Sequence, residues 1–228
     1  MNAATSRSVL LVPGSWHGAW AYDAVADRLT HAGVAVTAID LPSNDGASGL
    51  ADDAAAVRAA LDGIEQPTVV VGHSYGGIAV SEGAAGAPNA VGLVYLAAFM
   101  LDTGESLLDA MHHQLPDWIS LDEAAGSHIA QRSEEVLYGD CPPDVAAGAA
   151  ARLSRQSVAA IATPQTAAAW RSVPSTYVIC DQDRAVPPPV QEAMAARAAT
   201  VRHVPASHSP FLSRPGEVAD VVLQALGR

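Results

Sequence analysis

The fold of this chain is decided by the stretch TVVVGHSYGG, which runs from Thr68 to Gly77. Its first four residues form a β-branched run typical of a buried strand, and residues 78–85 are typical of a helix. Between them lies a G-x-S-x-G pattern, whose glycines permit a sharp turn in a space that a Cβ could not enter. This strand–turn–helix unit predicts that Ser74 stands clear of a sheet, at a helix N-terminus.

Short β-branched runs alternate with Ala-rich helical stretches on both sides of this unit, which is typical of a parallel sheet covered by helices. Strands are expected at residues 9–12, 34–39, 68–71, 91–97, 176–180 and 201–204. Helices are expected at residues 20–32, 50–62, 75–85, 188–198 and 215–226. The predicted fold class is therefore α/β, with a mostly parallel, doubly wound sheet of about six strands in a single domain, 1–228.

Residues 100–170 interrupt this alternation after the fourth predicted strand. They are helical in character and contain no convincing strand. An insertion of this length is too long for a plain crossover, so it predicts a helical cap over the carboxyl ends of the strands, where ligands bind in open α/β sheets. Most of its apolar side chains are expected to form the cap's own core. The candidates for a substrate pocket are Trp118, Met111 and Leu115, together with Trp16 from the loop after the first strand.

A serine hydroxyl is a poor nucleophile at neutral pH and requires a base. Of the eight histidines, His208 lies in the loop between the last predicted strand and the final helix, at the same sheet edge as Ser74. His17 and His73 lie in tight loops and are expected to make structural hydrogen bonds. His208 is therefore the candidate base, and the chain order serine, acid, histidine requires an acid between the two.

Three carboxylates follow strand ends: Asp102, Asp181 and Asp183. Asp102 leads into a turn at the start of the cap, where a turn or capping role is expected. Asp181 directly continues a strand, so the pleat sets its direction and it is expected to brace the loop. Asp183 lies two residues further, in a turn from which its carboxylate can point towards His208. Asp183 is the favoured acid, with Asp181 as the alternative.

Negative charge that develops on a carbonyl oxygen under attack needs preorganised N–H donors. One is expected from the backbone of Tyr75, the residue after the serine, and the other from Ser15 in the loop Pro13–Gly18. The alternative interpretation of this loop is a dinucleotide-binding turn, with Asp40 at the end of the next strand as weak support. The spacing G-x-G-x-x-G is absent, so no nucleotide cofactor is expected.

Charge and composition argue against several other classes of protein. The 24 acidic residues outnumber the 12 basic ones, which disfavours nucleic acids and anionic membranes as partners. The chain has no lysine, which removes Schiff-base chemistry and the P-loop. Cys141 and Cys180 are expected as reduced thiols, and no cluster has the spacing of metal ligands, so no metal is expected. The N-terminal apolar run is too short for a signal peptide or a membrane span, which predicts a cytoplasmic location.

Five landmarks occur in one order along the chain: HGAW at His17–Trp20, GHSYGG at Gly72–Gly77, YLAAFM at Tyr95–Met100, CDQD at Cys180–Asp183 and SHS at Ser207–Ser209. With them the sequence resembles the α/β-hydrolase family of plant hydroxynitrile lyases, plant methylesterases and their bacterial esterase relatives. The resemblance covers nearly the whole chain. It implies the α/β-hydrolase fold with a helical cap, no cofactor, and a triad of Ser74, Asp183 and His208. It also implies a homodimer as a partner state, because dimers are common in such families.

Two departures separate the chain from the lyase branch. Those lyases carry a lysine directly after the catalytic histidine, where this chain has Ser209, and a threonine in the first oxyanion loop, where it has Gly14. Without an ammonium group near the leaving cyanide, the hydrolytic branch is favoured. The expected function is a serine hydrolase that cleaves small to medium carboxylic esters through an acyl-enzyme, with lactones or thioesters as further candidate substrates. A hydroxynitrile lyase and a non-catalytic small-molecule receptor on the same fold are the alternatives.

Overall fold

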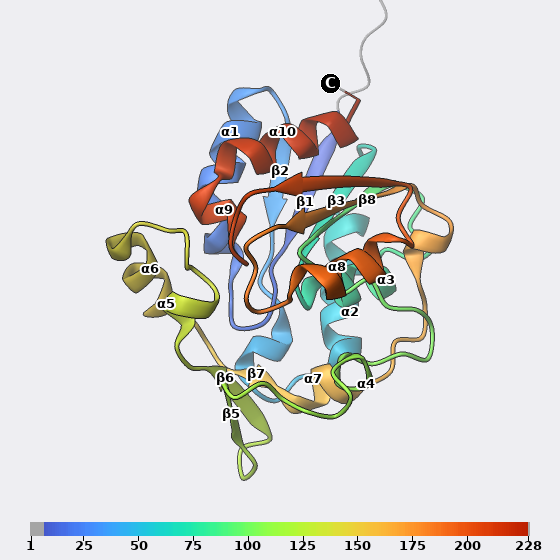
Figure 1. The fold of residues 1–228 in the computed structure, drawn as a ribbon. Coiled ribbons are helices and arrows are strands. Elements are labelled where there is room, and N and C mark those ends of the chain that lie inside the picture. The colour runs from blue at the N-terminus through green and yellow to red at the C-terminus, as the bar shows by residue number, and fades with distance from the viewer. Residues whose placement is uncertain (1–6, 228) are drawn as a thin grey trace, which may run out of the picture.

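A central sheet of parallel strands forms the middle of the molecule in this computed structural model, which describes residues 7–227 (Figure 1). The strand order is β2-β1-β3-β4-β8-β9, and each neighbouring pair is parallel. The strands are β1 (Ser8–Val12), β2 (Ala35–Ala38), β3 (Thr68–His73), β4 (Ala90–Leu96), β8 (Ser175–Cys180) and β9 (Thr200–Val204). The predicted α/β class and the six-stranded sheet are confirmed.

Helices cover both faces of this sheet because its strands alternate side chains between two apolar layers. In β1, Val9 and Leu11 pack on one face, while Leu10 and Val12 pack on the other. The first face is covered by α1 (Asp23–His31) and α10 (Pro215–Ala225), which lie side by side (Figure 1). The opposite face is covered by α2 (Leu50–Asp62), α3 (Gly76–Gly83) and α8 (Pro188–Ala195). Short helices at the loops are η1 (Ala19–Tyr22), η2 (Pro42–Asp45), η3 (Ala169–Arg171) and α9 (Pro210–Ser213).

The strand order reverses between β1 and β3. From β1 the chain moves outwards to β2, and it then returns across β1 to form β3 on the other side. The loops that leave the carboxyl ends of β1 and β3 therefore diverge, and this is the point at which open α/β sheets hold their ligands. The loop with Ser15 follows β1, and the turn with Ser74 follows β3.

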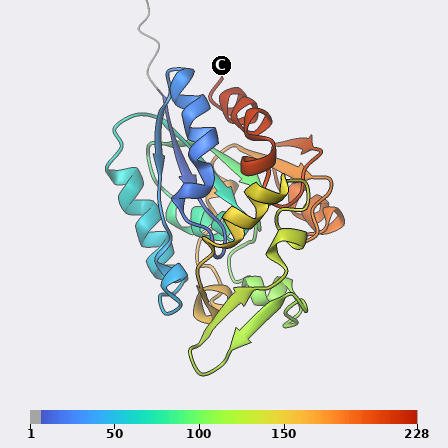
Figure 2. The ribbon, with the colours of Figure 1, turned by 90° about the vertical axis from the view of Figure 1, so that its left-hand side faces the viewer.

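The cap differs from its prediction because it contains a small antiparallel sheet beside its helices. The strands are β5 (Ile119–Asp122), β6 (Ser127–Ala130) and β7 (Gln156–Ser157), and the helices are α4 (Leu107–Ala110), α5 (Ser133–Val136), α6 (Pro143–Ala150) and α7 (Val158–Ala162). The expectation of no strand here is wrong. Strands of four residues are too short to show a clear alternation, and β7 joins the sheet from a distant part of the chain. The β5–β6 hairpin extends away from the central sheet (Figure 2).

Two further expectations concern cysteines and membrane spans. Cys141 and Cys180 are free thiols, as expected. Burial raises the pKa of Cys141 to about 11, so this thiol stays protonated and unreactive at neutral pH. Within the described part of the chain, no helix combines the length and the apolar character that crossing a bilayer requires.

Candidate active site

Ser74 occupies a sharp turn between β3 and α3. Its φ angle is +50°, in the left-handed region that a residue with a side chain adopts at a cost. A Cβ on Gly72 would lie 2.8 Å from the carbonyl oxygen of Gly76. A Cβ on Gly76 would collide with the carbonyl oxygen of Pro13. Both glycines are therefore needed for the backbone segments to pass this closely. The turn presents the 8 % exposed Ser74 side chain to the cavity described below.

His208 and Asp183 form a buried pair. Nδ1 of His208 lies 2.7 Å from Oδ2 of Asp183, and the two side chains are 3 % and 0 % exposed. Because the carboxylate accepts, His208 donates from Nδ1, which leaves Nε2 available to act as a base. Asp183 also accepts from Ala185 N (2.8 Å), Val186 N (2.9 Å) and Nε2 of Gln191 (2.9 Å). These three donors hold the carboxylate in one orientation.

Asp102 and Asp181, the competing carboxylates, have other partners. Asp102 accepts from Nε of Arg171 at 2.8 Å and from the backbone of Thr103, at the start of the cap. Oδ1 of Asp181 lies 2.7 Å from Nδ1 of His203 on the exposed surface. Of the three carboxylates, Asp183 is the one hydrogen-bonded to His208.

His17 and His73 make the structural hydrogen bonds expected of them. His73 donates from Nε2 to the carbonyl oxygen of His208 at 2.8 Å. His17 donates from Nδ1 to the carbonyl oxygen of Ser15 at 2.9 Å, and its Nε2 accepts from the Tyr138 hydroxyl at 2.9 Å. Burial lowers the pKa of His17 to about 4 and that of His73 well below its usual value, so both rings are neutral at pH 7. The two neutral rings support the backbone of His208 and of the loop with Ser15.

Two unpaired N–H groups lie beside Ser74. A Cβ on Gly14 would lie 2.8 Å from Cβ of Ser74, which shows how closely the loop after β1 approaches the serine. Within residues 7–227, the backbone N–H groups of Ser15 and Tyr75 have no protein acceptor, whereas that of Trp16 donates to Oδ1 of Asn44 at 3.1 Å. The Ser15 and Tyr75 groups are therefore free to bind an oxygen atom of a ligand.

Tyr75 also belongs to a buried chain of hydrogen bonds that the sequence did not indicate. Its hydroxyl donates to Oδ2 of Asp53 at 2.6 Å, and Oδ1 of Asp53 accepts from Ser43 N at 2.9 Å. Ser43 Oγ accepts in turn from Nε2 of Gln156 at 2.7 Å. Asp53 is fully buried, although an acidic residue in the first turn of a helix is usually solvated. This chain links the residue after Ser74 to α2 and to cap strand β7.

Removing the Tyr75 hydroxyl should destabilise the protein. In Tyr75→Phe the buried Asp53 carboxylate loses its hydroxyl partner, so unfolding in urea at pH 7 should give a free energy about 1.5–3 kcal/mol below wild type. The control is Tyr22→Phe, whose hydroxyl donates to the neutral carbonyl of Val12 at 3.1 Å, with an expected loss of about 0.5–1.5 kcal/mol. Equal losses would contradict the interpretation.

The same pair of variants predicts a pH dependence. Burial already raises the pKa of Asp53, so the folded state binds its proton more tightly than the unfolded state does. Lowering the pH protonates this carboxyl and removes the cost of burying its charge. The stability deficit of Tyr75→Phe should therefore shrink as the pH falls from 7 towards 5, and that of Tyr22→Phe should not follow this trend.

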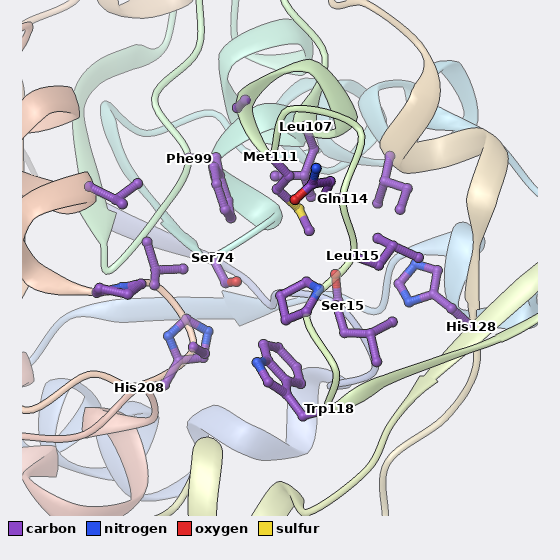
Figure 3. A pocket seen from close by; sticks show the side chains of 18 of the residues that line it. Ser15, Ser74, Phe99, Leu107, Met111, Gln114, Leu115, Trp118, His128 and His208 are labelled. Carbon is purple, nitrogen blue, oxygen red and sulfur yellow. The ribbon is translucent and has the colours of Figure 1, made fainter.

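A largely apolar cavity of about 240 Å³ lies beside Ser74 and His208, beneath the cap (Figure 3). Its walls include all four pocket candidates from the sequence: Trp16, Met111, Leu115 and Trp118. The rings of Trp16 and Trp118 meet edge to face, with centroids 5.8 Å apart. Phe99 is a wall residue that the sequence analysis missed, although its position after β4, at the carboxyl edge of the sheet, could have indicated it. Ser74, His208, Ser15 and the pocket candidates thus surround one space.

The loop after β1 packs tightly against the turn that contains His73 and Ser74. Asp40, whose position gave weak support to a nucleotide site, accepts from the backbone N–H of Ala19 at 2.7 Å. Gly14 is closely packed, since a Cβ there would lie 2.8 Å from Nδ1 of His73. In residues 7–227 no three His, Cys, Asp or Glu side chains are grouped so that they could hold a metal ion.

Comparison with known proteins identifies the family. Residues 9–221 match the model of the alpha/beta hydrolase family. The chain is 34 % identical over 241 residues to an alpha/beta hydrolase of Aspergillus novofumigatus, and this alignment covers 96 % of each chain. It is 26 % identical over 259 residues to Methylesterase 7 of Arabidopsis thaliana, which covers 98 % of each chain. A solved pyrethroid hydrolase from Sphingobium faniae has the same fold, with a TM-score of 0.83 at 24 % identity over 96 % of this chain and 97 % of that one.

These similarities agree with the landmarks in the sequence. Methylesterase 7 and a pyrethroid hydrolase of Sphingobium wenxiniae, which is 28 % identical over 96 % of this chain and 87 % of that one, represent two of the groups that the chain resembles. With the family match, the resemblance is confirmed. The family model covers most of the chain, including the turn with Ser74 and the loop with His208. The chain belongs to the alpha/beta hydrolase family.

Proposed function

We propose that this protein is a serine hydrolase that cleaves small to medium carboxylic esters through an acyl-enzyme. The observation that carries the proposal is the convergence of Ser74, in its strained turn, and His208 on one apolar cavity (Figure 3). His208 is hydrogen-bonded to the buried Asp183 behind it. Relatives named as a methylesterase and a pyrethroid hydrolase support ester chemistry.

In the proposed reaction Ser74 Oγ attacks the ester carbonyl while Nε2 of His208 takes its proton. Asp183 holds the imidazole in the tautomer that leaves Nε2 free, and the N–H groups of Ser15 and Tyr75 bind the oxyanion. His208 then gives the proton to the departing alcohol. A water molecule attacks the acyl-enzyme with His208 again as base, which releases the carboxylic acid and restores Ser74.

The cavity indicates which esters fit. Its walls are mostly apolar, and no arginine of the described residues 7–227 borders it, so an uncharged substrate with an apolar portion beneath the cap is favoured. The test is turnover of p-nitrophenyl acetate and longer p-nitrophenyl esters, followed by a panel in which the acyl and alcohol parts vary separately. We expect multiple turnovers. Absence of turnover across the whole panel would refute the proposal.

The same assays separate this function from a non-catalytic receptor, which the fold alone does not exclude. A receptor would bind a small molecule stoichiometrically without releasing product. Steady-state release of nitrophenol, in excess of the enzyme present, is the distinguishing result.

The lyase alternative predicts cleavage of mandelonitrile, which we expect to be slower than ester hydrolysis by about 10²-fold or more. Lysine is absent from the chain, and the residue after His208 is the buried Ser209, so the ammonium group that would stabilise a leaving cyanide is missing there. Cyanide release is measured beside p-nitrophenyl acetate hydrolysis on the same preparation. Comparable rates for the two reactions would overturn the choice of branch.

We further propose a cytoplasmic, homodimeric enzyme, as the sequence and the family resemblance led us to expect. Cell fractionation tests the location. Light scattering coupled to size exclusion tests the dimer, and a monomeric mass would remove that part of the proposal.

A further inference from the structure

His128 is a buried polar side chain that has no hydrogen-bond partner among residues 7–227. It lies on cap strand β6, is 2 % exposed, and borders the same cavity as Ser74, across that cavity from His208 (Figure 3). Neither of its ring nitrogens has a hydrogen-bond partner in the described part of the chain. Buried polar atoms normally find partners, because leaving one unpaired costs stability. An exception on the wall of a binding cavity points to a ligand group as the missing partner.

The ring is held firmly in place. Its strand pairs with both neighbours in the small sheet, with Leu121 opposite His128 on β5 and Gln156 opposite it on β7. Trp16 donates from Nε1 to the carbonyl oxygen of His128 at 3.1 Å, and the two rings meet at 90° with centroids 5.3 Å apart. With its backbone fixed by the sheet and its ring packed against Trp16, the buried side chain is preorganised for a ligand rather than free to turn towards water.

The charge of the ring limits which group it can bind. Burial lowers the pKa of His128 to about 4, so at pH 7 the imidazole is neutral, with one N–H donor and one acceptor nitrogen. A neutral ring does not select an anion, and among residues 7–227 no arginine borders the cavity to assist one. A hydroxyl is the simplest neutral group that can meet either nitrogen, because it both donates and accepts.

We propose that His128 is a specificity-determining residue that hydrogen-bonds a hydroxyl group of the substrate, remote from the ester bond. The substrate class is an otherwise apolar ester with a hydroxyl at the far end of its acyl or alcohol chain. This inference rests on the proposed ester hydrolysis and adds to it a polar contact at the far wall of the cavity. His128 would touch the substrate but not the reacting atoms.

The test compares esters that differ by one group. In the acyl series, p-nitrophenyl ω-hydroxyalkanoates of increasing length are matched with the alkanoates in which a methyl group replaces the hydroxyl. In the alcohol series, monoacetates of α,ω-diols are matched with alkyl acetates and followed by proton release. In wild type the ratio of kcat/KM, hydroxyl over methyl, should peak at one length in one series, about tenfold above its value at the other lengths.

Variants at position 128 test whether the ring nitrogens of His128 cause the peak in the kcat/KM ratio. His128→Phe keeps an aromatic ring but has no polar atom, and should lower the ratio at the peak by about tenfold. His128→Gln keeps a donor and an acceptor and should retain part of the peak. The control is His203→Phe, the same change on exposed strand β9, which should leave the peak as it is.

The possible outcomes distinguish a failure of this inference from a failure of the proposed ester hydrolysis on which it rests. If no ester in either series is turned over by wild type, the proposed ester hydrolysis fails. If esters are turned over but no length shows a peak, or the peak survives in His128→Phe, the role of His128 is refuted while the hydrolase stands. Because each ratio compares two esters in one preparation, partial misfolding of a variant does not change it, and the wild-type series tests the inference without any variant.

Discussion

Replacing Ser74 by alanine is expected to lower kcat/KM for p-nitrophenyl ester hydrolysis by about 10⁴-fold or more. The variant loses the oxygen that would form the acyl-enzyme, while the N–H groups of Ser15 and Tyr75 stay in place. Residual activity above the rate in water would report those donors and substrate binding alone. The matched control is Ser81→Ala on α3, whose hydroxyl donates to the carbonyl oxygen of Gly77 at 2.8 Å. We expect it to change the rate by less than about tenfold.

Covalent labelling tests the same residue independently. A serine-directed fluorophosphonate should modify wild type once per chain, on the peptide that contains Ser74, and should leave Ser74→Ala unlabelled. In the proposed mechanism His208 activates the serine, so His208→Ala should label much more slowly. Stoichiometric labelling at any other serine would refute the assignment of Ser74.

Replacing Asp183 by asparagine should lower kcat by about 10²–10⁴-fold. The amide oxygen takes the place of Oδ1, because the N–H groups of Ala185 and Val186 donate there at 2.8 and 2.9 Å. The amide nitrogen then faces Nδ1 of His208 as a donor. His208 must carry its proton on Nε2 in response, and in that tautomer it can no longer accept the proton of Ser74.

The control for this prediction is Asp181→Asn. That carboxylate pairs with the exposed His203, and exposed pairs contribute little, so kcat should change by less than about threefold. Each variant removes one negative charge, and the two positions are two residues apart in the chain. A difference between their rates therefore reports the tautomer of His208 rather than the loss of negative charge near the site. A crippled Asp181→Asn beside a mild Asp183→Asn would show that the acid has been misassigned.

The sequence by itself determined the central sheet and the turn at Ser74. A β-branched run such as Val69–Val71 is buried on both faces of a parallel strand, and its pattern depends only on adjacent residues. The glycines at 72 and 76 are required by close backbone contacts that any such turn creates, so they too are visible in the sequence. The position of His208 followed from topology, because loops after parallel strands all emerge at one edge of the sheet.

The sequence favoured one of the three carboxylates as the acid, and the structure shows which of them is hydrogen-bonded to His208. Sequence spacing favoured Asp183 because its turn leaves it free to point along the sheet edge. The hydrogen bond to His208, and the three donors that orient the carboxylate, join residues brought together by folding. Asp181, expected to brace the loop, pairs with the surface histidine His203 of the edge strand β9.

Only the tertiary structure decided the small cap sheet, the buried Asp53 and the unpaired His128. Strand β7 joins β6 from a distant part of the chain. The hydroxyl of Tyr75, in the turn before α3, donates to Asp53 on α2. Helix and strand propensities depend on residues that are adjacent in the chain. Whether a buried polar side chain finds a hydrogen-bond partner depends instead on which distant segments pack against it. A single histidine in the four-residue strand β6 carries no periodic signal. That its nitrogens have no hydrogen-bond partner within residues 7–227 is a property of the packed cap alone.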